Sequence, residues 1–316
     1  MAGDPKVIFV TGKGGVGKTT VTRLLTALGE AAGLRCAAVH LGEFTGIEIS
    51  SEDDLVLDEV SDVEPEASTE EPVPQSPTAQ NREIRIDPAD ALIDYLNDHG
   101  FGKLASRLIA TGVVGVIATA IPGIKDLLLL GKIKQLEQSN DYDLLVVDAP
   151  ATGHTLSFLT SPEGLRDIAK VGPLRKQSED VLAMLADESR SGCVIVTIAE
   201  ESPIDEALES VTVLGERTRI HVTSIVINQV LAPLSSNHDA PERETTESET
   251  SDPVDLAWRF RRNLQERQTE QLMRLKETYS GTTVALPLLP LTTVHSSLVD
   301  QLLEQLEVQM DLEVES

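Results

Sequence analysis

The sequence is short of cysteine, aromatic residues and positive charge, and each shortage argues against a class of protein. It has 316 residues, of which 2 are cysteine and 3% are aromatic. Lysine and arginine together number 26, against 52 acidic residues, so the net charge is −26. Nucleic acids and anionic membrane surfaces are both bound through basic patches. We therefore expect no nucleic-acid partner and no docking on an anionic membrane.

The two cysteines lie in apolar runs that are typical of strands. Cys36 falls in RCAAV and Cys193 in CVIVTI, and the sequence has no C-x-x-C pair. This pattern predicts buried thiols in a reducing cytosol, rather than a disulfide or a zinc site.

No stretch of the chain has the character of a membrane span. The longest uncharged run, residues 108–124, contains three glycines and a proline. We interpret it as a bent helix or a helix pair against the core or lining a groove, because these residues break a spanning helix. The N-terminus also lacks the charged-then-apolar pattern of a signal peptide. We expect a cytoplasmic protein without stable membrane insertion.

Two acidic segments, residues 50–81 and 235–252, contain few large apolar residues. Such segments cannot bury enough surface to offset the entropy of ordering them. We therefore predict two mobile, solvated insertions within a single domain that comprises residues 1–316.

Apolar, β-branched-rich runs alternate with helical stretches along the rest of the chain. The alternation predicts an α/β fold with a doubly wound, mostly parallel sheet. Residues 100–140 are expected to form a small helical subdomain. The expected strands are residues 6–10, 35–40, 143–148, 193–198, 223–228 and 283–288. The expected helix starts are Asp87-Pro88, Ser161-Pro162 and Ser202-Pro203.

The residues from Gly12 to Thr19 fit the phosphate-loop pattern G-x-x-x-x-G-K-[ST]. An expected strand precedes them and an expected helix follows, which is the context that this motif needs. In such a loop, backbone N–H groups and the helix N-terminus surround the phosphates. Lys18 is expected to reach the β- and γ-phosphates of ATP, and Thr19 to hold Mg²⁺. The predicted nucleotide-binding residues of the loop are Gly12, Lys13, Gly14, Gly15, Val16, Gly17, Lys18, Thr19 and Thr20.

A second site residue, Asp148, ends the apolar strand YDLLVVD. The carboxyl ends of parallel strands are where open α/β sheets bind ligands. A carboxylate at this point can hold Mg²⁺ through a water molecule, as a Walker B aspartate does. The polar turn at residues 152–155 follows directly, within expected reach of the γ-phosphate.

The loop carries a second lysine, Lys13, which an ordinary phosphate loop does not need. The stretch KGGVGKT resembles the deviant Walker A motif of the SIMIBI-class P-loop ATPases. In that class the extra lysine reaches across a dimer interface to the partner's nucleotide. The resemblance implies a catalytic role for Lys13 at the other subunit's site. The alternative is a solvated surface lysine.

Longer motifs resemble those of the arsenite-pump and tail-anchored-protein-targeting ATPase family. DAPATGHTL, which begins at Asp148, resembles its switch II, and IPGIKDLLLLGKI and VINQVL resemble two further motifs. The likeness covers most of the chain outside the acidic insertions and is greatest to short bacterial members that occur as paired paralogues. It implies that Asn228 reads the adenine and that Pro287 lies near the loop over the base. A strand cap is the alternative for Asn228.

The chain departs from that family at switch I, because no Asp-Pro-Ala directly follows the second expected strand, where the sequence reads LGEFTGIEIS. Glu43 is the nearest carboxylate and is our candidate to position the attacking water. If it faces solvent instead, we expect slow hydrolysis. The zinc C-x-x-C of the eukaryotic targeting factor and a thiol cluster for arsenite are also absent from the sequence.

The resemblance implies a Mg-ATP-dependent ATPase that works as a dimeric switch and carries or targets a client. A hydrophobic membrane protein is the client class that we expect. Two alternatives stay open, namely a weakly hydrolysing regulatory half of a heterodimer and the motor subunit of an anion efflux pump. The partner subunit is accordingly a second copy or a paralogous ATPase.

Overall fold

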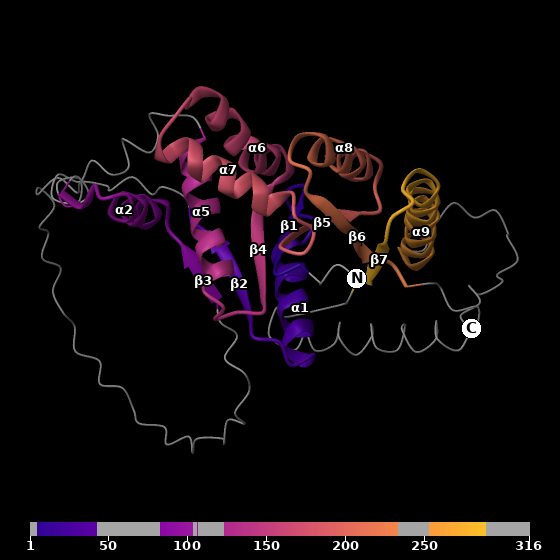
Figure 1. Ribbon diagram of the computed structural model, residues 1–316. Helices are drawn as coiled ribbons and strands as arrows, with labels where there is room; N and C mark the ends of the chain where they lie inside the picture. The colour runs from indigo at the N-terminus through magenta and orange to yellow at the C-terminus, as the bar shows by residue number, and fades with distance from the viewer. Residues whose placement is uncertain (1–4, 43–82, 104–105, 107–122, 233–252, 289–316) are drawn as a thin grey trace, which may run out of the picture.

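A computed structural model of the protein describes residues 5–42, 83–103, 106, 123–232 and 253–288, which are coloured in Figure 1. They form a seven-stranded sheet in the order β3-β2-β4-β1-β5-β6-β7, and all paired strands are parallel. The predicted α/β, doubly wound class is thus confirmed. The strands are β1 (Val7–Gly12), β2 (Cys36–Leu41), β3 (Glu83–Ile86), β4 (Leu144–Ala151), β5 (Ser191–Ile198), β6 (His221–Val230) and β7 (Thr283–Pro287).

Side chains along each central strand alternate between two cores. In β1, Val7 and Phe9 belong to the larger hydrophobic cluster, whereas Val10 belongs to the smaller one. In β5, Ile195 and Val194 divide between the same two clusters. Burial on both faces explains why these strands are continuous apolar runs.

The helices cover both faces of the sheet (Figure 1). Helix α1 packs on β1, β2 and β4 and closes the smaller cluster, while α6, α7 and α8 lie over the larger one. Helix α9 lies beyond β7, at one end of the sheet. The described helices are α1 (Lys18–Ala31), α2 (Pro88–Asp98), α5 (Ile124–Gln138), α6 (Thr152–Ile168), α7 (Pro173–Leu185), α8 (Glu201–Arg217) and α9 (Pro253–Thr278).

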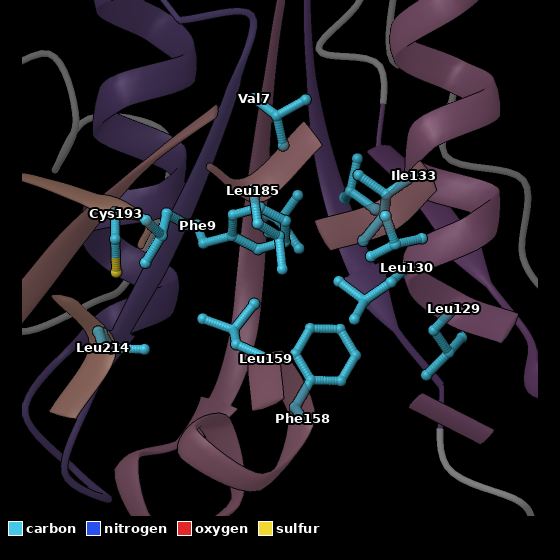
Figure 2. Packing of buried hydrophobic residues seen from close by; sticks show 14 of the residues in the cluster. Val7, Phe9, Leu129, Leu130, Ile133, Phe158, Leu159, Leu185, Cys193 and Leu214 are labelled. Carbon is cyan, nitrogen blue, oxygen red and sulfur yellow. The ribbon is translucent and has the colours of Figure 1, made fainter. Parts of the chain in front are cut away.

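Helix α5 is buried around most of its circumference. Residues 127–130 are four consecutive leucines, each at most 3% exposed. The helix packs against α2, α6 and α7. Figure 2 shows Leu130 and Ile133 in the larger cluster, together with Phe158 and Leu159 of α6. This packing holds α5 firmly beside the carboxyl edge of the sheet.

All six expected strands are confirmed, within three residues at each end. Sequence reasoning missed β3, a four-residue strand of sequence EIRI, because two of its four residues are charged. The expected helix start at Asp87-Pro88 is confirmed, since the Asp87 carboxylate accepts a 2.7 Å hydrogen bond from the backbone N–H of Ala89. The start expected at Ser202 lies one residue from that of α8.

The helix start expected at Ser161-Pro162 is wrong, because Pro162 lies inside α6. A proline has no N–H to donate to the carbonyl four residues earlier, here that of Phe158. The Ser161 hydroxyl donates to this carbonyl at 3.0 Å instead. The serine hydroxyl therefore donates to the carbonyl that Pro162 leaves without a backbone donor, and the helix continues through the proline.

Several predictions concern residues that the structure does not describe. The acidic insertions at 50–81 and 235–252 lie outside the described residues, as does Glu43. Of the helical segment predicted at 100–140, the second half contains α5, and residues 107–122 are outside the description. Within the described ranges, no helix has both the length and the apolar character needed to cross a membrane.

The larger cluster generates a prediction for stability. Leu159 is 0% exposed, whereas Leu34 is 44% exposed. We expect Leu159→Ala to lower the free energy of unfolding by about 2–5 kcal/mol, because it removes buried methyl groups and leaves a cavity. Leu34→Ala is the matched control and should change it by less than about 0.5 kcal/mol. Urea denaturation followed by circular dichroism measures both, and equal losses would contradict this account of the core.

Candidate functional site

The carboxyl ends of the parallel strands meet at one edge of the sheet. Asp148 of β4 lies in register with His40 of β2 on one side and Val10 of β1 on the other. Ile198, the last residue of β5, is in register with Asn228 of β6. The loop that follows β1 therefore lies among side chains from several strands, as expected for a ligand site at this edge.

Glycines determine the shape of this loop. Gly15 and Gly17 have φ of 84° and 96°, in the left-handed region that favours glycine. A Cβ at Gly12 would lie 2.0 Å from the carbonyl oxygen of Val196, so the loop begins in direct contact with β5. A Cβ on Gly14 or Gly15, in contrast, would meet no atom within 4 Å. The middle of the loop thus presents its backbone to open space, as a phosphate-binding loop must.

Asn228 holds the loop from the side of β6. Its side-chain amide donates to the carbonyl of Val16 at 2.9 Å, and the residue is 8% exposed. A Cβ at Gly17 would lie 2.2 Å from the same amide nitrogen. The structure thus gives Asn228 a contact with the loop itself. Its predicted role in reading adenine stays a prediction.

Lys18 is the first residue of α1, at the end of the phosphate loop. Its ammonium donates to the backbone carbonyl of Lys13 at 3.2 Å. Burial lowers the pKa of Lys18 below the usual lysine value, and the nearby charge of Asp148 opposes that lowering. Partial removal of water strengthens the electrostatic attraction between the ammonium of Lys18 and an incoming phosphate.

Thr19 and Asp148 are brought into direct contact. The Thr19 hydroxyl donates to Asp148 Oδ2 at 2.7 Å, and the His40 Nδ1 atom lies 3.7 Å from the same oxygen. His40 Nε2 is buried without a hydrogen-bond partner in the described structure. A hydroxyl beside a carboxylate is a set of oxygen ligands that suits Mg²⁺. This ion usually takes few protein ligands and completes its coordination with oxygens of water and of substrate phosphates. Across the described residues, no group of three His, Cys, Asp or Glu side chains offers a self-sufficient metal site.

Lys13 points away from Lys18 and contacts α8. Its ammonium donates to Glu206 Oε1 at 2.6 Å and to the Ser202 hydroxyl at 2.9 Å. Both side chains of the ion pair are more than a third exposed. An exposed pair of this kind contributes only about 0–1 kcal/mol, so it can be exchanged readily for another partner.

The first turn of α6 is joined to the strand that carries the loop. The Thr11 hydroxyl donates to Thr155 Oγ1 at 2.8 Å, and the Thr155 hydroxyl donates to the carbonyl of Pro150. Thr11 and Thr155 are each 1% exposed. The turn at residues 152–155 is thereby tied to β1 directly below the phosphate loop.

A cavity of about 630 Å³ opens beside the loop on the side of β2 and β4. Lys18, Thr19 and Asp148 line it, together with Lys125 of α5 and Phe158 of α6. Its volume is within the range of small-molecule sites. The predicted phosphate and metal residues therefore share one cavity with residues from two helices.

The two cysteines cannot act together on a ligand. Cys36 of β2 and Cys193 of β5 are buried, free, and separated by β4 and β1. At the usual strand spacing that separation is about 14 Å. Burial raises the pKa of Cys193 to about 12 and that of Cys36 to about 11, so both thiols stay protonated near neutral pH. Neither suits arsenite, which is bound by thiolates.

The structure gathers most of the predicted residues, and it adds some that sequence reasoning did not assign to the site. Thr20 lies in the first turn of α1, and Pro287 ends β7, in register with Val230 of β6. Glu43 is outside the described residues. The added residues are Thr11, His40, Lys125 and Ser202. Thr11 and His40 belong to no motif that would have assigned them to the site, and the patterns that contain Lys125 and Ser202 gave these two residues no role there.

The close contact at Gly17 yields a prediction. Gly17→Ala places a Cβ against Asn228 at a left-handed φ, and should lower the free energy of unfolding by about 1–3 kcal/mol. Gly14→Ala, in the same loop, meets no neighbouring atom and should change it by less than about 0.5 kcal/mol. Thermal unfolding without nucleotide separates the two. A Gly14→Ala effect as large as that of Gly17→Ala would contradict the proposed steric cause.

Comparison with known proteins agrees with this geometry. Residues 84–176 and 166–306 match the sequence profile of a family described as anion-transporting ATPase. The ATPase BagA of Mycobacterium tuberculosis is 31% identical over 229 residues, which cover 70% of this chain and 64% of BagA, less than two thirds of its length. An ATPase ASNA1 homolog of Entamoeba dispar is 27% identical over 263 residues, 72% of this chain and 76% of that protein. The ATPase ARSA1 of Chlamydomonas reinhardtii is 28% identical over 232 residues, 68% of this chain and 29% of that protein. The chain therefore belongs to the anion-transporting ATPase family.

Proposed function

We propose that this protein is a cytosolic, Mg-ATP-dependent ATPase that works as a dimeric switch and carries or targets a client. The observation that carries the proposal is the convergence of Lys18, Thr19 and Asp148 on one cavity beside a glycine loop of left-handed backbone. Family membership supports the use of ATP.

The reaction is attack of water on the γ-phosphate of ATP, with ADP and phosphate as products. The desolvated ammonium of Lys18 and the open backbone of Gly14 and Gly15 would stabilise the charge of the transferred group. Thr19 and Asp148 would hold Mg²⁺, which when bound neutralises charge on the β- and γ-phosphates. The hydrogen bond between Thr11 and Thr155 offers a route by which a change at the loop reaches α6.

Lys13 would act on the nucleotide of the partner subunit. In the single chain it is held by Glu206 and Ser202 of α8, outside the cavity that holds Lys18. Because that ion pair is exposed and weak, a phosphate presented by a second subunit can replace it. The dimer would close when both sites hold ATP and open after hydrolysis.

One observation favours the first of the two alternative functions, and another argues against the second. A regulatory, weakly hydrolysing half of a heterodimer is favoured by the sequence directly after β2, which has no Asp-Pro-Ala and has Glu43 as its nearest carboxylate. A motor subunit of an arsenite-type pump is disfavoured by the buried, separated thiols of Cys36 and Cys193. An anion that needs no thiolates remains compatible with the second alternative.

A subunit-mixing experiment tests the dimeric ATPase. Lys13→Ala and Asp148→Asn should each lower ATP turnover by about 10²-fold or more, because each removes charge stabilisation from the transition state. When the two variants are mixed and allowed to exchange subunits, the mixed dimer has one complete site. Turnover should then recover to about a quarter of the wild-type value, the share expected from random pairing of two symmetric subunits.

Lys6→Ala is the matched control, because the Lys6 ammonium donates to the exposed side chain of Asn140 at 3.3 Å and lies before the loop. It should hydrolyse ATP normally. If the mixture of Lys13→Ala and Asp148→Asn stays inactive, Lys13 acts within its own subunit. If Lys13→Ala alone hydrolyses ATP normally, Lys13 has no catalytic role. If the wild-type chain itself does not hydrolyse ATP until a paralogue is added, the regulatory alternative replaces the homodimer.

A pull-down tests the client. The wild-type chain held with a non-hydrolysable ATP analogue in native cytosol should retain membrane proteins that carry one terminal apolar segment. Lys18→Ala, which lacks the phosphate-binding lysine, should not retain them. Recovery of a second phosphate-loop ATPase without such proteins would contradict the carrier role and would support the heterodimer.

A further inference from the structure

The cavity beside the phosphate loop has a second lysine, Lys125, that the family motifs do not assign to nucleotide binding. It is the second residue of α5 and lines the cavity together with Asp126 and Leu129 of the same helix. Lys18, Thr19 and Asp148 line the same cavity. Lys125 thus faces the same space as the phosphate-binding end of the loop.

The place of this cavity along the sheet indicates which phosphate would occupy it. Its described lining comes from the loop, β2, β4, α5 and α6, and none comes from β5, β6 or β7. Asn228 and Pro287, the predicted base-side residues, lie on β6 and β7, on the other side of β1. In a phosphate loop the Thr hydroxyl and the Walker B aspartate lie at the β/γ end of the triphosphate. The cavity beyond Thr19 and Asp148 is therefore where the terminal phosphate projects.

Packing holds the start of α5 in position. Gly123, its N-cap, has a φ of 79°, and a Cβ there would lie 3.1 Å from Cβ of Ser161 in α6. Leu127 is 1% exposed and lies in the larger cluster. Lys125 itself is only partly buried. The first turn of α5 thus fixes the backbone from which the Lys125 side chain extends.

The charged side chains that line the cavity indicate a role for Lys125. The cavity is lined by two lysines, Lys18 and Lys125, and by two carboxylates, Asp126 and Asp148. In a chain with a net charge of −26, an incoming triphosphate needs local positive charge to be held. We propose that Lys125 binds the terminal phosphate of the nucleotide within its own subunit, an inference that rests on the proposed ATPase function. ADP lacks that phosphate, so Lys125 distinguishes ATP from ADP and makes α5 sensitive to the state of the nucleotide.

The test compares two nucleotides on Lys125→Gln, with Mg²⁺ present, by isothermal titration calorimetry. The β,γ-imido analogue of ATP should bind about tenfold more weakly than to the wild type, because one charge-assisted hydrogen bond is lost. Binding of ADP should change by less than about twofold, since ADP has no γ-phosphate. Lys125→Arg, which keeps the charge, should retain the preference for the triphosphate.

Lys132→Gln is the matched control, because Lys132 lies two turns further along α5 and pairs with Asp94 of α2. It should bind both nucleotides like the wild type. Equal weakening of both nucleotides by Lys125→Gln, or no weakening of either, would overturn the role of Lys125 while leaving the proposed function intact. A folded wild-type chain that binds no triphosphate would overturn the proposed function and this inference together.

Discussion

The site depends on the close approach of the phosphate loop to the two strands beside it. Gly12 contacts the backbone of β5 at Val196, and Gly17 contacts the Asn228 amide of β6, at distances that leave no room for a Cβ. Asn228 also donates to the carbonyl between these glycines, at Val16. The loop is thus held at both ends, while its middle residues stay open. Glycine adopts the left-handed backbone of this loop at little cost, and the contacts with the two strands fix the position of the loop.

The two lysines of the loop differ because their neighbours differ. Lys18 is partly desolvated and lies in the cavity, near the charge of Asp148. The ammonium of Lys13 instead forms an exposed ion pair with Glu206 on α8. The first arrangement suits permanent phosphate binding, and the second suits a side chain that changes partner. This difference gives a physical basis for a loop with two lysines, which one nucleotide in one chain does not need.

Asp148 connects the elements that a nucleotide would disturb. One of its oxygens accepts from Thr19 and lies near His40, so the loop and β2 meet at a single carboxylate. Two residues further, the carbonyl of Pro150 accepts from Thr155, which is itself bonded to Thr11 below the loop. Any ligand that moves Asp148 or the loop therefore acts on hydrogen bonds that lead into α6. Helix α5 borders the same cavity, and its leucines pack against α6, so the two helices would respond together.

Much of this molecule follows from local sequence patterns. The loop motif, a strand that carries Asp148 and the Asp87 cap were all predictable, because each depends on residues close together in the sequence. The strand itself continues three residues beyond Asp148, to Ala151. The six long strands were predictable because burial on both faces makes them continuously apolar. The short strand β3 was not, since neighbouring β2 rather than its own charged sequence stabilises it.

Other features were decided by the tertiary structure alone. Pro162 is tolerated inside α6 because a serine hydroxyl takes up the carbonyl that the proline leaves, a contact that no propensity predicts. Lys13 meets Glu206 across 193 residues of sequence and Asn228 meets Val16 across 212, and Lys125 reaches the cavity only through the packing of α5 on α6. The sequence by itself determined the class of fold and the chemistry of the loop. Which distant side chains complete the site was decided by the order of the parallel strands and by the packing of the helices on them, because these place residues that are far apart in sequence around the loop after β1.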